Sequence, residues 1–184
     1  MTKLRGFTLV EILVVIAIIA ILTSVAAPSF NNVIKSNRMT SAVNSFLADM
    51  RFARSEAMRR GGNVVLCRSD SPEASPPTCA TTTGTNGWAS GWVVYVDQNN
   101  NGAIETAEVL RVQGPITTID SIMQTSSGGA RNSLAFTATG RFTLSSTLSL
   151  QFGGSNFSNE IQRIICVSVG GRARVAGDGY ANCN

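Results

Sequence analysis

Two arginines near the C-terminus, Arg172 and Arg174, lie one residue apart in the segment GGRARV. Side chains of an extended chain alternate with a period of two, so both guanidinium groups would point to the same face. A guanidinium offers fork-shaped donors that fit the oxygens of a phosphate group. Gly170 and Gly171 precede the pair and allow backbone to approach a ligand closely. This pattern predicts a phosphate-binding loop; the simpler alternative is that the two arginines only solvate a strand.

Two further arginines are candidates for the same site. Arg163 and Arg141 precede the pair in the sequence, and either would lie near it if strand pairing brought them close. The sequence alone does not fix that pairing.

Four cysteines form an even set, as expected for an exported domain in an oxidising compartment. Four cysteines allow three connectivities, which sequence cannot decide. We favour the pairs of sequence neighbours, Cys67 with Cys79 and Cys166 with Cys183, because each closes a short loop or ties down a tail. A zinc site is disfavoured because the chain has no C-x-x-C pair and no histidine.

The absence of histidine also bears on catalysis. A Ser-His or Cys-His pair cannot exist in this chain, so the sequence predicts no catalytic residue and no enzyme activity. A membrane-anchored hydrolase is therefore disfavoured, and no cofactor is expected.

The segment DQNNNGAIETAE, from Asp97 to Glu108, has the spacing of a calcium-binding EF-hand loop. An EF-hand needs helices on both sides, whereas GWVVYVD before it and VLRV after it are typical of strands. We interpret the segment as a hairpin turn and expect no tight metal site; weak calcium binding is the alternative.

The elements that must position these residues follow from apolar spacing. Residues 30–57 have apolar side chains at a period close to 3.6, and Gly61 and Gly62 are a natural helix end. Beyond Gly62 the period changes to two, with turn residues between short apolar runs. The sequence predicts an α+β fold in which antiparallel strands pack on the C-terminal half of a long helix. The expected strands are 63–68, 91–97, 108–112, 117–123, 133–139, 141–144, 148–153 and 162–169.

The N-terminus begins MTKLRGFTLVEILVV, and residues 12–34 contain no charged residue. As a helix, that stretch would be on the order of 34 Å long, enough to cross a hydrocarbon core. Lys3 and Arg5 before it predict a cytoplasmic N-terminus. An ordinary secretory signal is the alternative, but the run is long and contains Glu11, which is costly at membrane depth.

The segment RGFTLVE resembles the class III signal of type IV prepilins. The resemblance implies that a prepilin peptidase cuts between Gly6 and Phe7 and that the new N-terminal Phe7 is methylated. It also implies a partner for Glu11, because the carboxylate of one subunit can meet the N-terminal amine of its neighbour during assembly. The predicted organisation is a leader over 1–6, a transmembrane and assembly helix over 7–30 and a soluble globular domain over 31–184.

Three further segments, GWVVYVDQNNNG, AFTATGRF and GGRARV, resemble the FimT/GspH group of minor pilins and pseudopilins. Members with a C-terminal G-R-x-R motif are associated with DNA binding in natural transformation. The resemblance thus implies a type IV pilin-like fold. It also implies that the protein binds double-stranded DNA non-specifically through Gly171, Arg172 and Arg174. Its other expected partners are major and minor pilins, the prepilin peptidase and the inner membrane before export to the cell surface. The alternative is a structural minor pilin or a type II secretion pseudopilin that primes filament assembly without binding nucleic acid.

Overall fold

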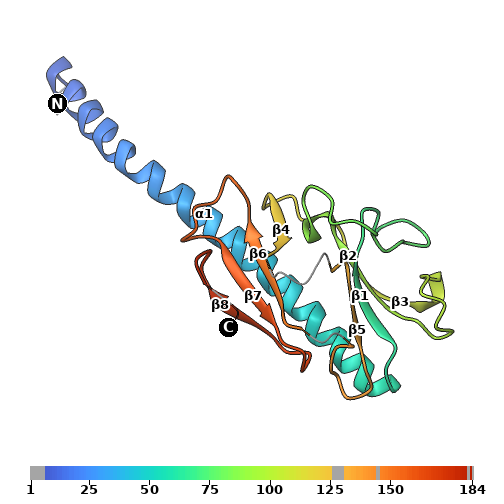
Figure 1. Cartoon of the computed structure of the whole chain (residues 1–184). Coiled ribbons are helices and arrows are strands. Elements are labelled where there is room, and N and C mark those ends of the chain that lie inside the picture. The colour runs from blue at the N-terminus through green and yellow to red at the C-terminus, as the bar shows by residue number, and fades with distance from the viewer. Residues whose placement is uncertain (1–6, 126–130, 144–145, 182, 184) are drawn as a thin grey trace. The chain divides into compact units, whose positions relative to one another are not determined.

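The computed structural model of the chain describes residues 7–125, 131–143, 146–181 and 183, including their side chains except those of 25–29. Contacts divide the chain into two compact units, Met1–Asn37 and Arg38–Asn184. One helix, α1 (Leu9–Arg60), contributes residues to both units (Figure 1).

Thr8 caps the start of α1, and Gly61 and Gly62 end it. The Thr8 side-chain oxygen accepts the backbone N–H of Glu11 at 3.2 Å, which satisfies one free donor of the first turn. At the other end, Gly61 and Gly62 have φ angles of 85° and 112°, and the Gly62 N–H donates to the Ala57 carbonyl at 2.8 Å. The predicted helix end at these glycines is confirmed.

The N-terminal unit has a surface rich in apolar side chains. Its first described residue, Phe7, is 81% exposed. Further along α1, Leu9, Val10 and many of the residues that follow are also exposed. Among the described residues, no helix combines the length and apolar character needed to cross a membrane.

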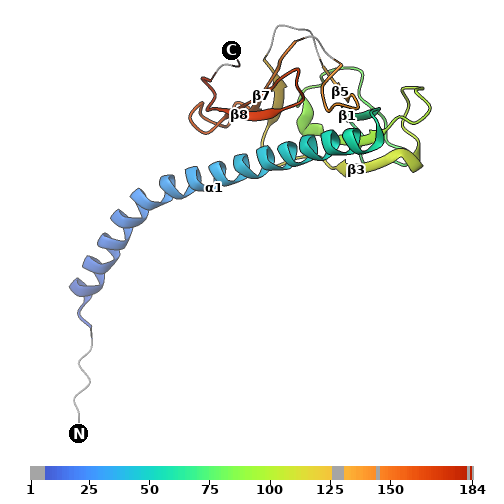
Figure 2. The ribbon, with the colours of Figure 1, turned by 90° about the horizontal axis from the view of Figure 1, so that it is seen from below.

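The core of the second unit forms where two sheets meet the Arg38–Arg60 part of α1. Phe46 is fully buried and makes edge contacts with Trp88, Trp92 and Phe152, at ring-centroid distances of 5.7, 5.3 and 5.7 Å. Figure 2 shows most of the strands on one side of this part of the helix. The helical residues of the core are Met39, Ala42, Val43, Phe46, Leu47, Met50, Ala53 and Ala57. Their spacing is the 3.6-residue period expected from the sequence.

Both sheets are antiparallel and have four strands. The first has the order β3-β2-β1-β5, and the second has the order β4-β6-β7-β8 (Figure 1). The strands are β1 (Val64–Arg68), β2 (Trp92–Val96), β3 (Val109–Gln113), β4 (Ser121–Gln124), β5 (Ser133–Phe136), β6 (Leu148–Gly153), β7 (Arg163–Val167) and β8 (Ala173–Gly177). A long helix packed on antiparallel sheets is the α+β fold that the sequence predicted.

The expected strands differ from the structure at several places: the one over 133–139 ends at Phe136, and β8 was not among them. In place of a strand over 141–144, the described part of that segment has a single bridge between Phe136 and Phe142. Gly140 has a φ of 70° and closes a tight turn, after which the pairing extends to the bond from the Thr143 N–H to the Ala135 carbonyl at 3.2 Å in the described residues. The strand expected over 117–123 begins only at Ser121.

Both favoured cysteine pairs are present as disulfides. Cys67 joins Cys79 and Cys166 joins Cys183, with Cα–Cα distances of 5.6 and 5.4 Å. The first bond closes the loop that leaves β1, and the second ties the C-terminal tail to β7.

The turn from Asp97 to Glu108 is held by two carboxylates that bind its backbone N–H groups. The Asp97 carboxylate accepts the N–H groups of Asn101 and Gly102, each at 3.0 Å. The buried Glu108 carboxylate accepts the N–H groups of Gln98 at 2.8 Å and of Glu105 at 3.3 Å. The flanking elements β2 and β3 are strands, as predicted. Within the described residues, no three metal-ligating side chains are grouped to hold an ion.

Asp49 connects α1 to the first sheet. It is only 6% exposed, and its carboxylate accepts the indole N–H of Trp92 at 2.8 Å and a guanidinium N–H of Arg111 at 2.6 Å. The Arg111 guanidinium also lies 4.2 Å above the ring of Phe52. This polar group therefore fixes the helix against β2 and β3.

Candidate nucleic-acid interface

The hairpin of β7 and β8 positions Arg172 and Arg174. The Ser168 N–H donates to the Arg172 carbonyl at 2.9 Å, and the Gly171 N–H donates to the Ser168 carbonyl at 2.8 Å. Arg174 lies opposite Cys166 in the ladder. Arg172 immediately precedes β8, and both arginine side chains are exposed. Strand alternation places the two guanidinium groups on one face.

Gly171 allows this hairpin turn to touch the turn that contains Gly140. Gly171 has a φ of 74°, and a Cβ atom there would lie 1.9 Å from the Gly140 carbonyl oxygen and 3.5 Å from the Arg141 Cα. The Phe142 N–H adds a bond of 3.0 Å to the Val169 carbonyl. Any side chain at position 171 would force the two turns apart.

A concave surface of about 450 Å³ lies beside the hairpin. Arg172 and Arg174 line it together with Ser168, Thr147 and the disulfide between Cys166 and Cys183. The disulfide holds the tail against the same part of β7 that Arg174 faces. The site thus combines two exposed cations with backbone fixed by a covalent bond.

The structure brings Arg141 to this site and leaves Arg163 elsewhere. Arg141 lies in the turn that Gly171 contacts and is exposed. Arg163 begins β7, about 13 Å from the hairpin turn at four residues of strand rise. One guanidinium nitrogen of Arg163 donates to the carbonyls of Glu160 at 2.7 Å and Gln162 at 2.8 Å, so it caps its own loop.

Arginines of the described chain differ in whether they have a protein partner; those of the site lack one, as do the exposed Arg38 and Arg51 on α1. Among the described residues, the side chains of Arg141, Arg172 and Arg174 have no hydrogen bond or ion pair. Arg59 and Arg60 instead bind Glu56, and their hydrogen bonds lower the pKa of Glu56 to about 2. Cations without a partner carboxylate are the ones available to an anionic ligand.

Sequence reasoning missed one arginine of this region, Arg54 on α1. Its Nε would lie 2.9 Å from a Cβ atom at Gly140, so its side chain lies against the same turn. The signal available in the sequence was its place at the margin of the apolar face of the helix, next to the core residue Ala53. The partner turn, however, is far away in the sequence.

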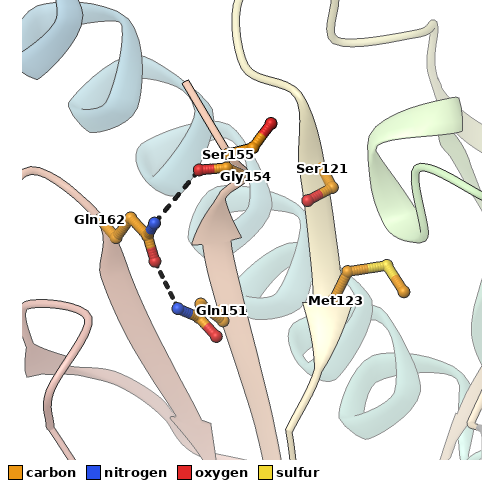
Figure 3. Close-up of a pocket in the computed structure, with 6 residues that line it drawn as sticks. All are labelled: Ser121, Met123, Gln151, Gly154, Ser155 and Gln162. Carbon is orange, nitrogen blue, oxygen red and sulfur yellow. Dashed lines mark hydrogen bonds between the residues drawn. The ribbon is translucent and has the colours of Figure 1, made fainter. Parts of the chain in front are cut away.

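A second concave surface lies on the other half of the second sheet, between β4 and the ends of β6 and β7 (Figure 3). The Gln162 amide donates to the Gly154 carbonyl at 3.2 Å and accepts a hydrogen bond from the Gln151 amide. Ser121, Met123 and Ser155 complete the lining, which contains no charged side chain. Because no lysine or arginine is among its lining residues, this surface offers no cation to an anionic ligand.

The residues expected to act in processing and assembly lie in the N-terminal unit. Phe7 and Glu11 are both exposed. Gly6, with the rest of the leader, lies outside the described residues. The backbone of Glu11 is bound to Thr8 in the first turn of α1, where the helix dipole favours an acidic side chain.

A long N-terminal helix whose C-terminal part carries two antiparallel sheets is the architecture of the type IV pilin class. Residues 42–171 match the family described as Type II transport protein GspH, and residues 1–27 match the prokaryotic N-terminal methylation motif. The chain belongs to the GspH family and is a minor pilin or pseudopilin of the GspH/FimT type.

Individual relatives agree with this class. The chain is 35% identical over 78 residues to prepilin peptidase-dependent protein D of Escherichia coli K12, an alignment that covers 42% of this chain. It spans about half of that relative, 53% of its length. Two crystal structures of the type IV minor pilin FimU of Pseudomonas aeruginosa PAO1 share the fold at 20% identity, with TM-scores of 0.60 and 0.54. They cover 80% and 79% of this chain, and the matches take in 96% and 99% of the respective FimU chains.

Proposed function

We propose that this minor pilin binds extracellular double-stranded DNA through Arg172 and Arg174 at the β7–β8 hairpin, for DNA uptake in natural transformation. The observation that supports the proposal is that both guanidinium groups are exposed, lie on one face and have no partner among the described residues. Arg141, in the adjoining turn, is proposed as a third contact. Gly171 serves by allowing the two turns to touch.

The ligand chemistry follows from the kind of donor present. Uptake must accept many sequences, so the contacts should be to phosphates and not to base edges. Such binding is weak, with dissociation constants on the order of 10⁻⁴–10⁻⁶ M at physiological salt. Several copies on one filament would raise the overall avidity.

The proposal is tested by titrating the full chain, in a non-ionic detergent, with a short duplex at two salt concentrations. With roughly two to four phosphates neutralised, we expect log K against log salt to have a slope of about −2 to −4. Association is followed by fluorescence anisotropy of a labelled duplex. Absence of binding at the lower salt concentration would contradict the proposal and favour the alternative role.

The alternative is a structural minor pilin or type II secretion pseudopilin that primes filament assembly without nucleic acid. The family match supports this candidate equally, because GspH is described as a type II transport protein. The leader, the helix and the two sheets serve both roles. The exposed, unpaired Arg172 and Arg174 are the feature that favours DNA binding.

Assembly itself is proposed to use Phe7 and Glu11. After cleavage between Gly6 and Phe7, the methylated amine of one subunit would meet the Glu11 carboxylate of the next. The proposed route is a stay in the inner membrane with the globular domain in the periplasm, followed by assembly with other pilins at the cell surface.

Replacing Glu11 with alanine should leave membrane insertion unchanged or slightly better, because a costly charge is removed from an apolar segment. Incorporation into filaments should fall severalfold. Quantitative immunoblotting of sheared filaments against total membranes measures the ratio. Mass spectrometry of the wild-type subunit, which should begin with methylated Phe7, verifies processing. Normal incorporation of the variant would contradict the proposed pairing.

A further inference from the structure

Arg54 lies on the flank of α1 that faces the turn containing Gly140. A Cβ atom at Gly140 would be 2.9 Å from the Arg54 Nε and 3.0 Å from its Cγ. The Arg54 side chain, including its Nε, therefore packs on this turn. Arg54 is half-buried, whereas Arg141 in the same turn is exposed.

The guanidinium group of Arg54 has no protein partner among the described residues. Its Nε is buried and lacks a hydrogen-bond acceptor there. Arg68 shows the usual arrangement of a buried arginine, because its guanidinium donates to the carbonyls of Gly87 at 2.7 Å and Thr82 at 2.6 Å and pairs with Asp70. Arg54 therefore differs from Arg68 in that its charge is not offset by a protein acceptor in the described part of the chain.

Arg54 adjoins the proposed DNA site through two glycines. Gly140, on which Arg54 packs, is the residue whose carbonyl oxygen Gly171 touches. A continuous strip thus starts on the helix, crosses the turn and ends on β8. We call Arg54, Arg141, Arg172 and Arg174 the arginine strip.

No exposed aromatic side chain accompanies the arginine strip among the described residues. The exposed aromatic residues there are Phe7, Phe30 and Tyr180. Tyr180 follows the far end of β8, where the Gly179 N–H donates to the Asn159 carbonyl at 2.7 Å. Sites for single-stranded nucleic acid combine cations with aromatic rings on which bases stack. The strip has only the cations, which favours contact with the sugar-phosphate backbone.

We propose that Arg54 is a fourth phosphate contact and that the arginine strip binds the backbone of duplex DNA. The inference rests on the proposed function and extends it from the hairpin to the helix. The duplex would lie across both turns, with Arg54 and Arg174 at opposite ends of the contact. A phosphate would bind the terminal nitrogens of the Arg54 guanidinium, because the Nε is buried against the turn.

Arg54→Gln should weaken binding of a short duplex by roughly three- to tenfold at about 0.1 M salt and should reduce the salt slope by about 1. The matched control is Arg59→Gln, which removes the same charge from the same helix. Arg59 is five residues along, about 140° around the helix axis, and already binds Glu56. We expect the control to change affinity by less than about twofold, since distant exposed charges are screened. Equal effects of the two variants would overturn the proposal.

A second variant separates charge from shape. Arg54→Lys keeps the positive charge but loses the planar, fork-shaped donor. Because the salt slope depends on charge, it should stay within about 0.5 of the wild-type value. A slope that fell as far as in Arg54→Gln would show that Arg54 acts by holding the turn and not by contacting phosphate. Thermal unfolding by circular dichroism checks that each variant is folded.

The same experiment separates this proposal from the one it rests on. Loss of binding on removal of Arg172 and Arg174, with no effect of Arg54→Gln, would overturn only the role of Arg54. No binding by the wild-type chain at low salt would overturn both. An affinity for single-stranded DNA well above that for duplex of equal length would also contradict backbone contact, because the strip would then be reading bases.

Discussion

The double variant Arg172→Gln and Arg174→Gln should bind duplex DNA about ten- to a hundredfold more weakly than the wild-type chain near 0.1 M salt. Each lost phosphate contact reduces the salt slope by about 1, so the slope should fall by about 2. Glutamine keeps a side chain that can form hydrogen bonds but carries no charge. Both positions are exposed, so the substitutions should not disturb the core. Anisotropy titrations of the full chain in detergent at two salt concentrations measure both quantities.

The control for this variant removes two charges from another place. Arg59→Gln and Arg60→Gln together change the net charge equally, and both residues are bound to Glu56 in the wild-type chain. Lys3 and Arg5 are present in every variant, so any binding that they contribute is constant. If the control weakened binding as much as the Arg172 and Arg174 variant, affinity would follow net charge, and the β7–β8 hairpin would not be the site.

The sequence predicted the parts of this fold that depend on local spacing. Gly61 and Gly62 mark the end of α1 because few other residues adopt their backbone angles, and that signal is local. The change of apolar period after Gly62 likewise predicted strands, and it located seven of the eight strands, β1 to β7. The strand expected over 141–144 was wrong for the described residues 141–143, where only a single bridge between Phe136 and Phe142 follows the turn at Gly140.

The candidate site was predictable only where its residues are neighbours in the chain. The pair of Arg172 and Arg174 follows from period-two alternation within one hairpin. Whether Arg141 or Arg163 lies nearer the pair depends on contacts between distant segments, and the close contact of Gly171 with Gly140 places the turn of Arg141 beside the hairpin. Arg54 is brought to the same place by packing between a helix and a turn far apart in sequence. No periodicity within either segment encodes that contact.

The polar contact between α1 and the first sheet is another feature that sequence did not reveal. Asp49 interrupts no pattern, since it stands beside the apolar face of the helix. Its partners Trp92 and Arg111 are 43 and 62 residues away in the chain. Both bonds join α1 to the first sheet, so the loss of Asp49 should lower the stability of the domain.

Asp49→Ala should lower the free energy of unfolding by about 2–4 kcal/mol. The main loss comes from the Trp92 indole N–H, which is buried and would have no acceptor. The ion pair with Arg111 adds less, because the Arg111 side chain is 44% exposed and water screens it. For a chain of this size the midpoint of thermal unfolding should fall by roughly 5–15 °C. Circular dichroism of the full chain in detergent measures that midpoint.

Two matched variants identify which bond carries the effect. Asp49→Asn keeps an oxygen that can accept the Trp92 N–H, so it should cost only about half as much as alanine. Arg111→Gln leaves the bond from Trp92 to Asp49 intact and removes an ion pair whose arginine is 44% exposed, so its cost should stay near 1 kcal/mol. The expected order of midpoints is therefore Arg111→Gln highest, Asp49→Asn between, and Asp49→Ala lowest. If Asp49→Ala were as stable as Arg111→Gln, the buried indole bond would contribute little, and the helix would be held to the first sheet by apolar contacts such as those of Phe46 alone.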